Sequence, residues 1–353
     1  MNNTPFFGPE KPADKIGFFW KFIAVVFAVV AVFTISVFTN KLEFTSELNE
    51  ISLVMEKMDE LAKTDEVQAG GDVVVEPIKI PKSEIPKLVG KLKNSDEFTA
   101  QGIIVKDHKS GALLYSKNEY EKRSIASITK LMSALVLLEK NPDWDSTATV
   151  IGDDSMDTHM YAGDVYTLDQ LWHAALVGSS NKAILSLANA LDWPSEAFVE
   201  RMNQKARELG MTETNFIEPT GLDEGNQSSA SDLVILLNNA LQNEKIKEAL
   251  KTIEYNLYSE QRGKEHHMWN TNWLLLGWVE NDFEEVIGGK TGYTNAAGYS
   301  FVVTVKNRDG NMVDIVVLGT GEHEDRFTEA RDLANMVFES YQWPTKNGDS
   351  LFE

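Results

Sequence analysis

The feature that most constrains this chain is an apolar run near its start, from Phe22 to Phe38, which holds no charged residue and no proline. From Gly17 onward about 22 residues are available, enough for a helix to cross a hydrocarbon layer of about 30 Å. Lys21, near one end, can extend its amine to the lipid headgroups. We therefore expect residues 17–39 to form an uncleaved membrane-spanning signal anchor, preceded by a short cytoplasmic tail at residues 1–16.

A cleaved signal peptide is the alternative to an anchor. The apolar run is long for one, and the sequence after it, TNKLE from Thr39, contains no small-x-small cleavage site. A short tail before the run and a large acidic part after it favour an N-terminus inside the cell and an exported remainder. The lipid bilayer is thus the expected partner of residues 17–39.

Charge and cysteine content exclude several classes of function. Asp and Glu number 54 against 33 Lys and Arg, a net charge of −21, whereas a nucleic-acid surface needs clustered basic residues. Because the chain has no cysteine, it forms no disulfide, thiolate zinc site, iron–sulfur cluster or cysteine nucleophile. The six histidines lack the spacing of metal ligands, so we expect no metal site and no cofactor.

Residues 40–95 have the composition of a helical stem followed by a linker. Apolar residues recur there at alternating intervals of three and four, as in a short coiled coil: Leu48, Ile51, Met55, Met58 and Ala62. A monomeric amphipathic stem explains the same pattern, so self-association through residues 45–62 would be weak. Gly and Pro then interleave with Lys and Glu up to Pro86, which is typical of a linker. We expect this stretch to hold the next domain away from the membrane.

Residues 96–345 form one predicted domain with strands at both ends. Short β-rich runs lie at 101–107, 111–116, 284–291, 299–306 and 312–318. Helical patterns lie between them, in a long block at 127–193 and at 195–209 and 229–251, and a last amphipathic helix covers 325–341. This order predicts an α+β fold, with one antiparallel β-sheet whose first and last strands meet and with helices on its faces.

Ser127 and Lys130 open an apolar segment, SITKLMSALVLLEK, which predicts a buried helix. Residues three apart share a helix face, so the hydroxyl and the amine can meet. Desolvation at the edge of such a helix disfavours the ammonium form, and a neutral amine can act as a general base. Alone, the pair is a weak signal and is better explained by an ordinary N-cap followed by a lysine that reaches solvent.

Two more short motifs follow along the chain. Ser179 and Asn181, between two helical patterns, offer a hydroxyl for proton relay and an amide for holding a peptide carbonyl. Lys290-Thr291-Gly292 ends a strand, where a glycine lets a bound chain approach closely. The charge of the lysine in this motif would depress the pKa of the first lysine and favour an anionic substrate terminus.

In this order, S-x-x-K, S-x-N and K-T-G are the set of motifs of serine penicillin-binding enzymes. The chain resembles the D-alanyl-D-alanine carboxypeptidases, the low-molecular-mass penicillin-binding proteins of bacterial cell-wall metabolism. The likeness covers roughly residues 95–342 and includes GDVYTLDQLWHAALVGSSN, WNTNWLL and VIGGKTGYTNAAGYSFVVTV. It implies a serine hydrolase, extracytoplasmic on the bacterial cytoplasmic membrane, that removes terminal D-Ala from peptidoglycan stem peptides and binds β-lactam antibiotics.

The resemblance also implies catalytic roles. Ser127 would be the acylated nucleophile and Lys130 its base, while Ser179 and Asn181 would assist proton transfer and substrate positioning. The oxyanion hole would use the backbone N–H groups of Ser127 and Tyr293.

Binding of the substrate's terminal carboxylate is implied for the third motif, through Lys290 and Thr291 beside Gly292. An arginine after the last strands would help to hold the same carboxylate. Arg326 in HEDRF is the best match for it, with Arg331 as the second choice.

The chain departs from the family pattern near the second motif. Lys182 follows Asn181 where the family usually has an acidic residue, and the approach loop DTHMYAGDVY lacks the usual serines. Substrate recognition on that side is therefore open.

Three other activities remain as alternatives to a carboxypeptidase. A DD-endopeptidase cutting D-Ala cross-links would use the same motifs. A class A β-lactamase would need an E-x-x-L-N-type loop where this chain reads IEPTGLDEGN. A sensor or binding domain would be acylated by β-lactams without turning over.

Overall fold

The computed structural model describes residues 85–344 apart from 156 and 158. The predicted tail, anchor and 45–62 stem lie outside these residues and stay predictions. Within the part of the chain that is described, no helix is both long and apolar enough to cross a membrane. β1 (Lys87–Leu88), inside the stretch predicted as a linker, pairs antiparallel with β13 (Tyr341–Gln342). The two ends of the described chain therefore meet.

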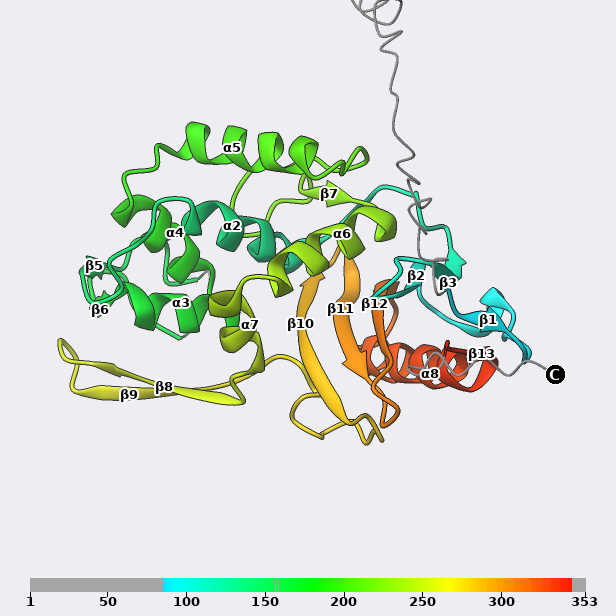
Figure 1. Cartoon of the computed structure of the whole chain (residues 1–353). Coiled ribbons are helices and arrows are strands. Elements are labelled where there is room, and N and C mark those ends of the chain that lie inside the picture. Colours follow the sequence, from blue (N-terminus) through cyan, green and yellow to red (C-terminus); the bar gives the residue numbers. More distant parts are fainter. Residues whose placement is uncertain (1–84, 156, 158, 345–353) are drawn as a thin grey trace, which may run out of the picture. The chain divides into compact units, whose positions relative to one another are not determined.

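A five-stranded antiparallel sheet with the order β10-β11-β12-β2-β3 forms the centre of the domain (Figure 1). Its strands are β2 (Gly102–Asp107), β3 (Leu113–Lys117), β10 (Glu285–Thr294), β11 (Gly298–Lys306) and β12 (Met312–Thr320). β12 pairs with β2, with Val316 opposite Ile104. The prediction that the first and last strands of one sheet meet is confirmed.

Alternating side chains of these strands divide the core into two layers. In β2, Ile104 belongs to the cluster under the helical region, while Ile103 and Val105 belong to the cluster under the C-terminal helix α8 (Asp325–Ser340). Strand side chains point to opposite faces with a period of two, so one strand supplies both layers. Figure 1 shows α8 on the side of the sheet away from α2 and α6.

The helical region is more interrupted than its apolar pattern predicts. It contains α2 (Thr129–Leu138), α3 (Leu168–Leu176), α4 (Asn181–Ala190), α5 (Ser195–Glu208), α6 (Ala230–Leu241) and α7 (Glu244–Lys251). The predicted block at 127–193 is wrong as one helical unit, because β5 (Thr147–Thr149) and β6 (Val165–Thr167) form a hairpin inside it. Pro142 and the left-handed Asn141 follow α2, and neither conformation continues a helix.

A second hairpin, β8 (Glu254–Ser259) with β9 (Lys264–Trp269), extends from the body of the domain (Figure 1). The sequence did not predict it, because polar residues on both faces of its strands weaken the alternation. Two smaller elements complete the domain: β4 (Arg123–Ser124) pairs with β7 (Gln227–Ser228), and a 3₁₀ turn, η1, covers Ser95–Glu97.

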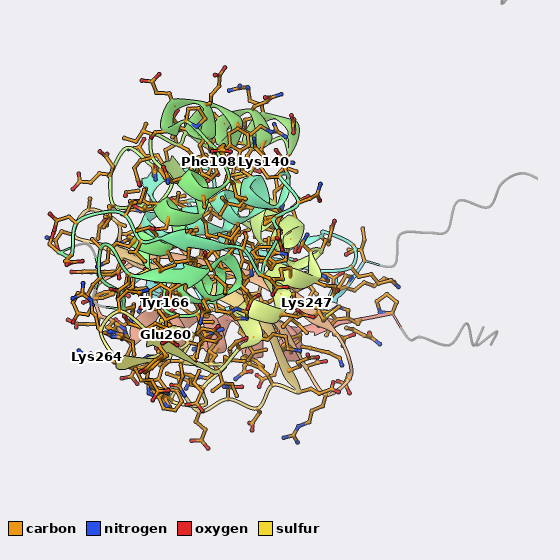
Figure 2. The ribbon with its side chains drawn as sticks, turned by 90° about the vertical axis from the view of Figure 1, so that its left-hand side faces the viewer. Lys140, Tyr166, Phe198, Lys247, Glu260 and Lys264 are labelled. Atoms are coloured by element: carbon orange, nitrogen blue, oxygen red, sulfur yellow. The ribbon has the colours of Figure 1, made fainter. Side chains whose placement is uncertain are left out.

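Helix α5 lies on the outside of the helical region and is anchored by an aromatic contact. Phe198 is buried and meets the Trp193 ring edge to face, with their centroids 5.7 Å apart. Lys140 Nζ lies 4.4 Å from the centroid of the Trp193 ring, which adds a cation–π contact to this aromatic pair; Figure 2 labels Lys140 and Phe198. The amphipathic pattern predicted for 195–209 thus buries its apolar stripe as expected.

An ion pair fastens the β2–β3 turn to the centre of the sheet. His108 Nδ1 lies 2.8 Å from an oxygen of Asp314, a fully buried residue of β12 that also accepts a hydrogen bond from Thr304. The hydrogen bond to Asp314 raises the pKa of His108, and burial opposes it. A raised pKa means that the folded protein binds this proton more tightly than the unfolded chain does.

This pair predicts a pH-dependent contribution to stability. Its stabilisation is complete below the unfolded histidine pKa of about 6.5 and is lost as the pH rises through the higher pKa of folded His108. His108→Gln should therefore reduce the free energy of unfolding more at pH 5.5 than at pH 9, as measured by urea denaturation. An equal loss at both pH values would contradict this assignment.

Candidate active site

Ser127 lies in a short 3₁₀ turn, η2 (Ala126–Ile128), that leads directly into the buried helix α2. Ala126, fully buried, has a φ of +47°. A left-handed conformation at a non-glycine residue costs about 1–2 kcal/mol, so packing around it must hold it in place. The strained turn places the Ser127 hydroxyl at the wall of a pocket.

Lys130 is completely buried, and its amine contacts three oxygen atoms. Nζ lies 2.8 Å from Ser127 Oγ, 2.6 Å from Asn181 Oδ1 and 2.7 Å from the carbonyl oxygen of Thr220. The first and second predicted motifs are thus joined at one nitrogen. The third oxygen comes from a loop to which the sequence assigned no role.

Burial lowers the pKa of Lys130 to about 7, against the opposing charges of Glu218 and Asp157. Near neutral pH the free amine is therefore accessible. The amide oxygen of Asn181 and the carbonyl of Thr220 can only accept hydrogen bonds, so they take the two N–H groups of a neutral amine. Its lone pair then faces the Ser127 hydroxyl, in the geometry for taking that proton.

Ser179 occupies the turn between α3 and α4 with a φ of +60°. Lys290 Nζ, from the edge strand β10, lies 2.8 Å from Ser179 Oγ. Burial first, and then the charges of Lys130 and Arg326, hold the pKa of Lys290 well below its ordinary value. The predicted second and third motifs therefore meet as a hydroxyl–amine pair beside the first.

Arg326, in the first turn of α8, lines the same pocket as Ser127 and is buried. It donates to the carbonyl of Gly292 over 3.2 Å and to His323 Nε2 over 2.7 Å. Burial lowers its pKa to about 10. The second choice, Arg331, instead pairs with Asp332 and is absent from the residues lining this pocket.

The structure explains the glycine at position 292 differently from the sequence, because it packs against the protein's own backbone and not only against a bound chain. A Cβ at Gly292 would lie 2.6 Å from the carbonyl oxygen of Ile125 and 3.3 Å from the Cβ of Ala126. The glycine therefore lets β10 approach the turn that carries Ser127. Tyr293, next along β10, lines the pocket with its side chain 48% exposed.

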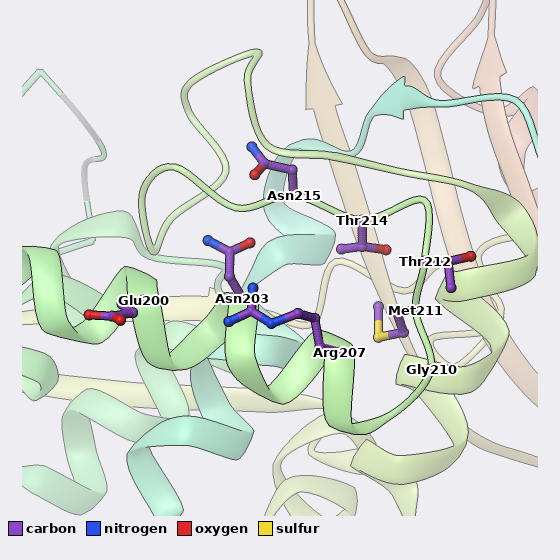
Figure 3. Close-up of a pocket in the computed structure, with 8 residues that line it drawn as sticks. All are labelled: Glu200, Asn203, Arg207, Gly210, Met211, Thr212, Thr214 and Asn215. Carbon is purple, nitrogen blue, oxygen red and sulfur yellow. The ribbon is translucent and has the colours of Figure 1, made fainter. Parts of the chain in front are cut away.

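The pocket formed by these groups has a volume of about 360 Å³. Ser127, Ser179, Thr291, Tyr293 and Arg326 all line it. A larger pocket of about 650 Å³ lies along α5 and the loop after it, and none of the three motifs contributes to it (Figure 3). In an acidic protein, the buried amines and the guanidinium beside the first pocket favour an anionic ligand.

Glu218 organises the loop that carries Thr220. Its carboxylate accepts hydrogen bonds from the backbone N–H groups of Thr220 and Gly221 and from the side chain of Asn226. A Cβ at Gly221, which has a φ of +89°, would lie 1.9 Å from the carbonyl oxygen of Ala126. From the sequence, this stretch, IEPTGLDEGN, was compared with the loop that a class A β-lactamase would need.

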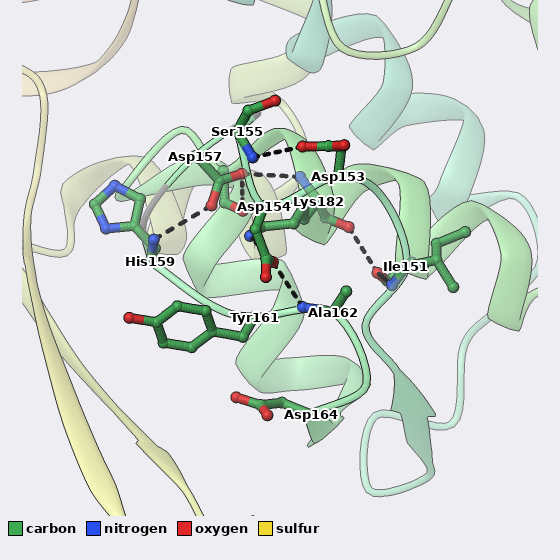
Figure 4. Close-up of polar contacts among 12 residues, drawn as sticks. Ile151, Asp153, Asp154, Ser155, Asp157, His159, Tyr161, Ala162, Asp164 and Lys182 are labelled. Atoms are coloured by element: carbon green, nitrogen blue, oxygen red, sulfur yellow. Dashed lines mark hydrogen bonds and ion pairs between the residues drawn. The ribbon is translucent and has the colours of Figure 1, made fainter. Parts of the chain in front are cut away.

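Lys182, the departure from the family pattern, is fully buried and neutralised by the approach loop. Its Nζ lies 2.9 Å from Asp154, and its backbone N–H donates to Asp157 (Figure 4). Asp157 also accepts a hydrogen bond from Ser180, the N-cap of α4. A lysine fits at this position because the loop supplies two carboxylates to the start of α4.

Of the residues that the structure describes, none form a cluster of three or more metal-ligand side chains. Four aromatic residues to which the sequence assigned no role also line the site: Trp269, Trp273, Trp278 and His323. Two of them, Trp269 and Trp273, lie in the string WNTNWLL.

Comparison with known proteins finds a family model, described as D-alanyl-D-alanine carboxypeptidase of peptidase family S11, matching residues 90–322. The chain is 31% identical over 270 residues to the D-alanyl-D-alanine carboxypeptidase DacF of Bacillus subtilis, covering 74% of this chain and 67% of that protein. It is 32% identical over 243 residues to a D-alanyl-D-alanine endopeptidase of Pseudomonas aeruginosa, and this match covers 67% of this chain and 76% of that protein. Among solved structures, ampicillin-bound penicillin-binding protein D2 of Listeria monocytogenes is similar, with a TM-score of 0.60, 27% identity, and coverage of 71% of this chain and 100% of that one.

The geometry around Lys130 predicts an unusual titration. Lys130 should titrate near pH 7, as followed by NMR of lysines labelled at Cε, whereas exposed lysines titrate near 10.4. Glu218→Gln should lower this value further, because the carboxylate charge favours the ammonium form. Glu244→Gln, an exposed acid on α7, serves as the control and should leave it unchanged. Titration of Lys130 above pH 9 would contradict the assignment.

Two left-handed glycines allow a matched test of the packing against Ser127. Gly221→Ala should displace the Ala126–Ser127 turn and slow acylation of Ser127 by an active-ester probe about 100-fold, as expected for a misplacement of about 1 Å. Gly210→Ala, at a φ of +76° with open space around it, should cost only the backbone strain of about 1–2 kcal/mol and leave acylation unchanged. Equal effects of the two substitutions on acylation would rule out the packing role.

Proposed function

The chain belongs to the D-alanyl-D-alanine carboxypeptidase family and is a peptidase, and from this premise we propose that it removes the terminal D-Ala of peptidoglycan stem peptides through an acyl-enzyme on Ser127. One observation carries the proposal. The three motifs meet at two buried amines, Lys130 on Ser127 and Asn181, and Lys290 on Ser179. This arrangement supplies a nucleophile, a base and a proton relay beside one pocket.

Acylation begins with the transfer of a proton from Ser127 to Lys130. The neutral amine takes the proton of Ser127 as Oγ attacks the carbonyl carbon between the last two D-alanines. Backbone N–H groups of Ser127 and Tyr293 would stabilise the oxyanion. Ser179, placed against the amine of Lys290, passes a proton to the departing D-Ala. Water then attacks the ester, with Lys130 again as base.

Recognition of the substrate's end rests on Thr291 and Arg326, which line the pocket, and on Lys290, whose amine contacts Ser179. Lys290 contributes charge, Thr291 a hydroxyl, and Arg326 a guanidinium that forms a hydrogen bond to the Gly292 carbonyl. Burial, and then the charges of Lys130 and Arg326, lower the pKa of Lys290, so a carboxylate bound there would stabilise its ammonium form. A substrate ending in a free carboxylate therefore fits better than an internal peptide bond without one.

We extend the proposal to β-lactam binding and to the membrane. Penicillin would acylate Ser127 in place of the peptide, as is suggested by the similarity to a protein whose structure holds ampicillin. Residues 17–39 would anchor the enzyme in the bacterial cytoplasmic membrane, with the catalytic domain outside the cytoplasm. The 45–62 stem would provide weak self-association at most.

Rapid β-lactam hydrolysis is less well supported than carboxypeptidase activity. Both oxygens of Glu218, the carboxylate in the IEPTGLDEGN stretch, accept hydrogen bonds from neighbouring N–H groups, including those of Thr220 and Gly221. A carboxylate committed to holding a turn is poorly placed to activate a deacylating water.

Ser127→Ala tests the proposal directly. The full-length protein in detergent should be labelled by fluorescent penicillin and should release D-Ala from a peptide ending in D-Ala-D-Ala. Ser127→Ala should lose the labelling and reduce the release by several orders of magnitude, because it removes the nucleophile. Ser195→Ala, an exposed serine on α5, should retain both activities.

Three results would contradict the proposal. Labelling that does not depend on Ser127 would remove the nucleophile assignment. Stable labelling without release of D-Ala would instead indicate a sensor, and fast penicillin hydrolysis would indicate a β-lactamase.

A further inference from the structure

The start of α4 carries both contacts through which the second motif acts. Asn181 Oδ1 lies 2.6 Å from Lys130 Nζ, and Ser179 Oγ lies 2.8 Å from Lys290 Nζ. Ser179 has a left-handed φ of +60°, a conformation that a serine keeps only where its surroundings hold it. The contacts that fix the first residues of α4 therefore also fix the distances on which the proposed proton transfers depend.

A carboxylate from outside the three motifs binds this start of α4. Asp157 lies in the loop before β6, and its Oδ2 accepts hydrogen bonds from Ser180 Oγ over 2.9 Å and from the backbone N–H of Lys182 over 3.0 Å (Figure 4). Ser180 and Lys182 are the two neighbours of Asn181 in the chain. One carboxylate oxygen thus holds the backbone on both sides of the amide that accepts from Lys130.

The same loop contacts α4 at two further points. Lys182 Nζ is fully buried and lies 2.9 Å from Asp154 Oδ1, and the backbone N–H of Ile151 donates to Ser186 Oγ over 3.0 Å (Figure 4). A buried ammonium is costly unless a counter-charge lies beside it, so Asp154 is needed where it is. The loop is therefore bound to both the first and the second turn of α4.

The end of this loop is bound to the β8–β9 hairpin as well. Asp164 is almost completely buried and accepts hydrogen bonds from Arg262 Nε over 2.8 Å and from Ser259 Oγ over 2.9 Å. The ring centroids of Tyr161 and His266 are 5.5 Å apart, and the guanidinium carbon of Arg262 lies 4.3 Å from the Tyr161 centroid. Asp157 thus belongs to a segment that two other elements hold in place.

The charge of Asp157 also acts on the base. Burial lowers the pKa of Lys130, and the charges of Glu218 and Asp157 oppose this effect because they favour the ammonium form. On β10, Lys290 is a third charged group of this site, and repulsion from Lys130 lowers its pKa. Glu218 lies in the Thr220 loop and Asp157 in the loop before β6, so substitution can separate the two carboxylates.

Building on the proposed function, we propose that Asp157 is a positioning residue for the acylation of Ser127. Its carboxylate holds Ser180 and Lys182, and through them the side chain of Asn181 that accepts from the base. It acts through Asn181 and not by contact with the substrate. The acidic residue that the family usually has after S-x-N is a lysine in this chain, and here the loop supplies the carboxylate.

Two substitutions of Asp157 separate its geometry from its charge. Both hydrogen bonds end on one oxygen, so asparagine can keep them, whereas alanine removes them. In the full-length protein, Asp157→Ala should reduce kcat/KM for release of D-Ala from a peptide ending in D-Ala-D-Ala about 100-fold, as expected for a misplacement of about 1 Å. Asp157→Asn should retain most of the wild-type kcat/KM at its pH optimum.

The pH dependence is a readout that a purely structural role would leave unchanged. In Asp157→Asn the acid limb of kcat/KM, which reports protonation of Lys130, should shift to lower pH, because the removed charge no longer favours the ammonium form. NMR titration of Lys130 should show the same downward shift. Asp153→Asn is the matched control: this exposed acid of the same loop accepts from the backbone N–H of Ser155, and its substitution should change neither readout.

The outcomes distinguish the positioning role from the proposed function. Wild-type kcat/KM in Asp157→Ala, equal losses in the alanine and asparagine variants, or an acid limb that stays in place in Asp157→Asn would each overturn the positioning role. If Asp157→Ala fails to fold, as judged by thermal unfolding, the acid limb of Asp157→Asn decides. A wild-type protein that releases no D-Ala would overturn the proposed function, and the NMR titration would still show whether Asp157 acts on Lys130.

Discussion

The site depends on one costly burial, the enclosure of the Lys130 amine inside a predominantly apolar helix region. Taking an ammonium out of water without partners is strongly unfavourable, so such a group loses its proton or acquires close acceptors. Here both occur, because the pKa falls to about 7 and three oxygens lie within 2.8 Å of Nζ. These oxygens come from η2, the start of α4 and the Thr220 loop. The relative placement of these elements is therefore tied to the chemistry.

Close backbone packing holds this arrangement from two sides. Gly221 and Gly292 both pack against the Ile125–Ala126 backbone, at distances that leave no room for a Cβ. Between them, Ala126 keeps a left-handed conformation that it would leave if the packing were loosened. The reactive hydroxyl is thus positioned by two glycines far from it in sequence. Only one of the two belongs to a motif recognised from the sequence.

The sequence predicted the strands whose side chains alternate and the helices whose apolar residues recur at helical spacing. The alternating strands around residues 101–107 and 299–318 and the amphipathic helix at 325–341 agree with β2, β11, β12 and α8. The hairpins β5–β6 and β8–β9 were missed, because their strands are short or carry polar residues on both faces. The second hairpin carries Trp269, which lines the pocket of the site.

By itself the sequence determined the Ser127–Lys130 pair, because an interval of three residues at the start of a helix brings two side chains to one face. It also identified Ser179, Asn181 and Lys290, which the fold brings into contact with one another or with Lys130. Only the tertiary structure decided that Thr220 accepts from Lys130, that Asp154 neutralises Lys182, and that Arg326 rather than Arg331 faces the pocket. Those contacts join residues separated by 90 and 28 positions, or depend on how α8 is oriented against the sheet. No local propensity encodes such distances, since they arise from packing of the whole core.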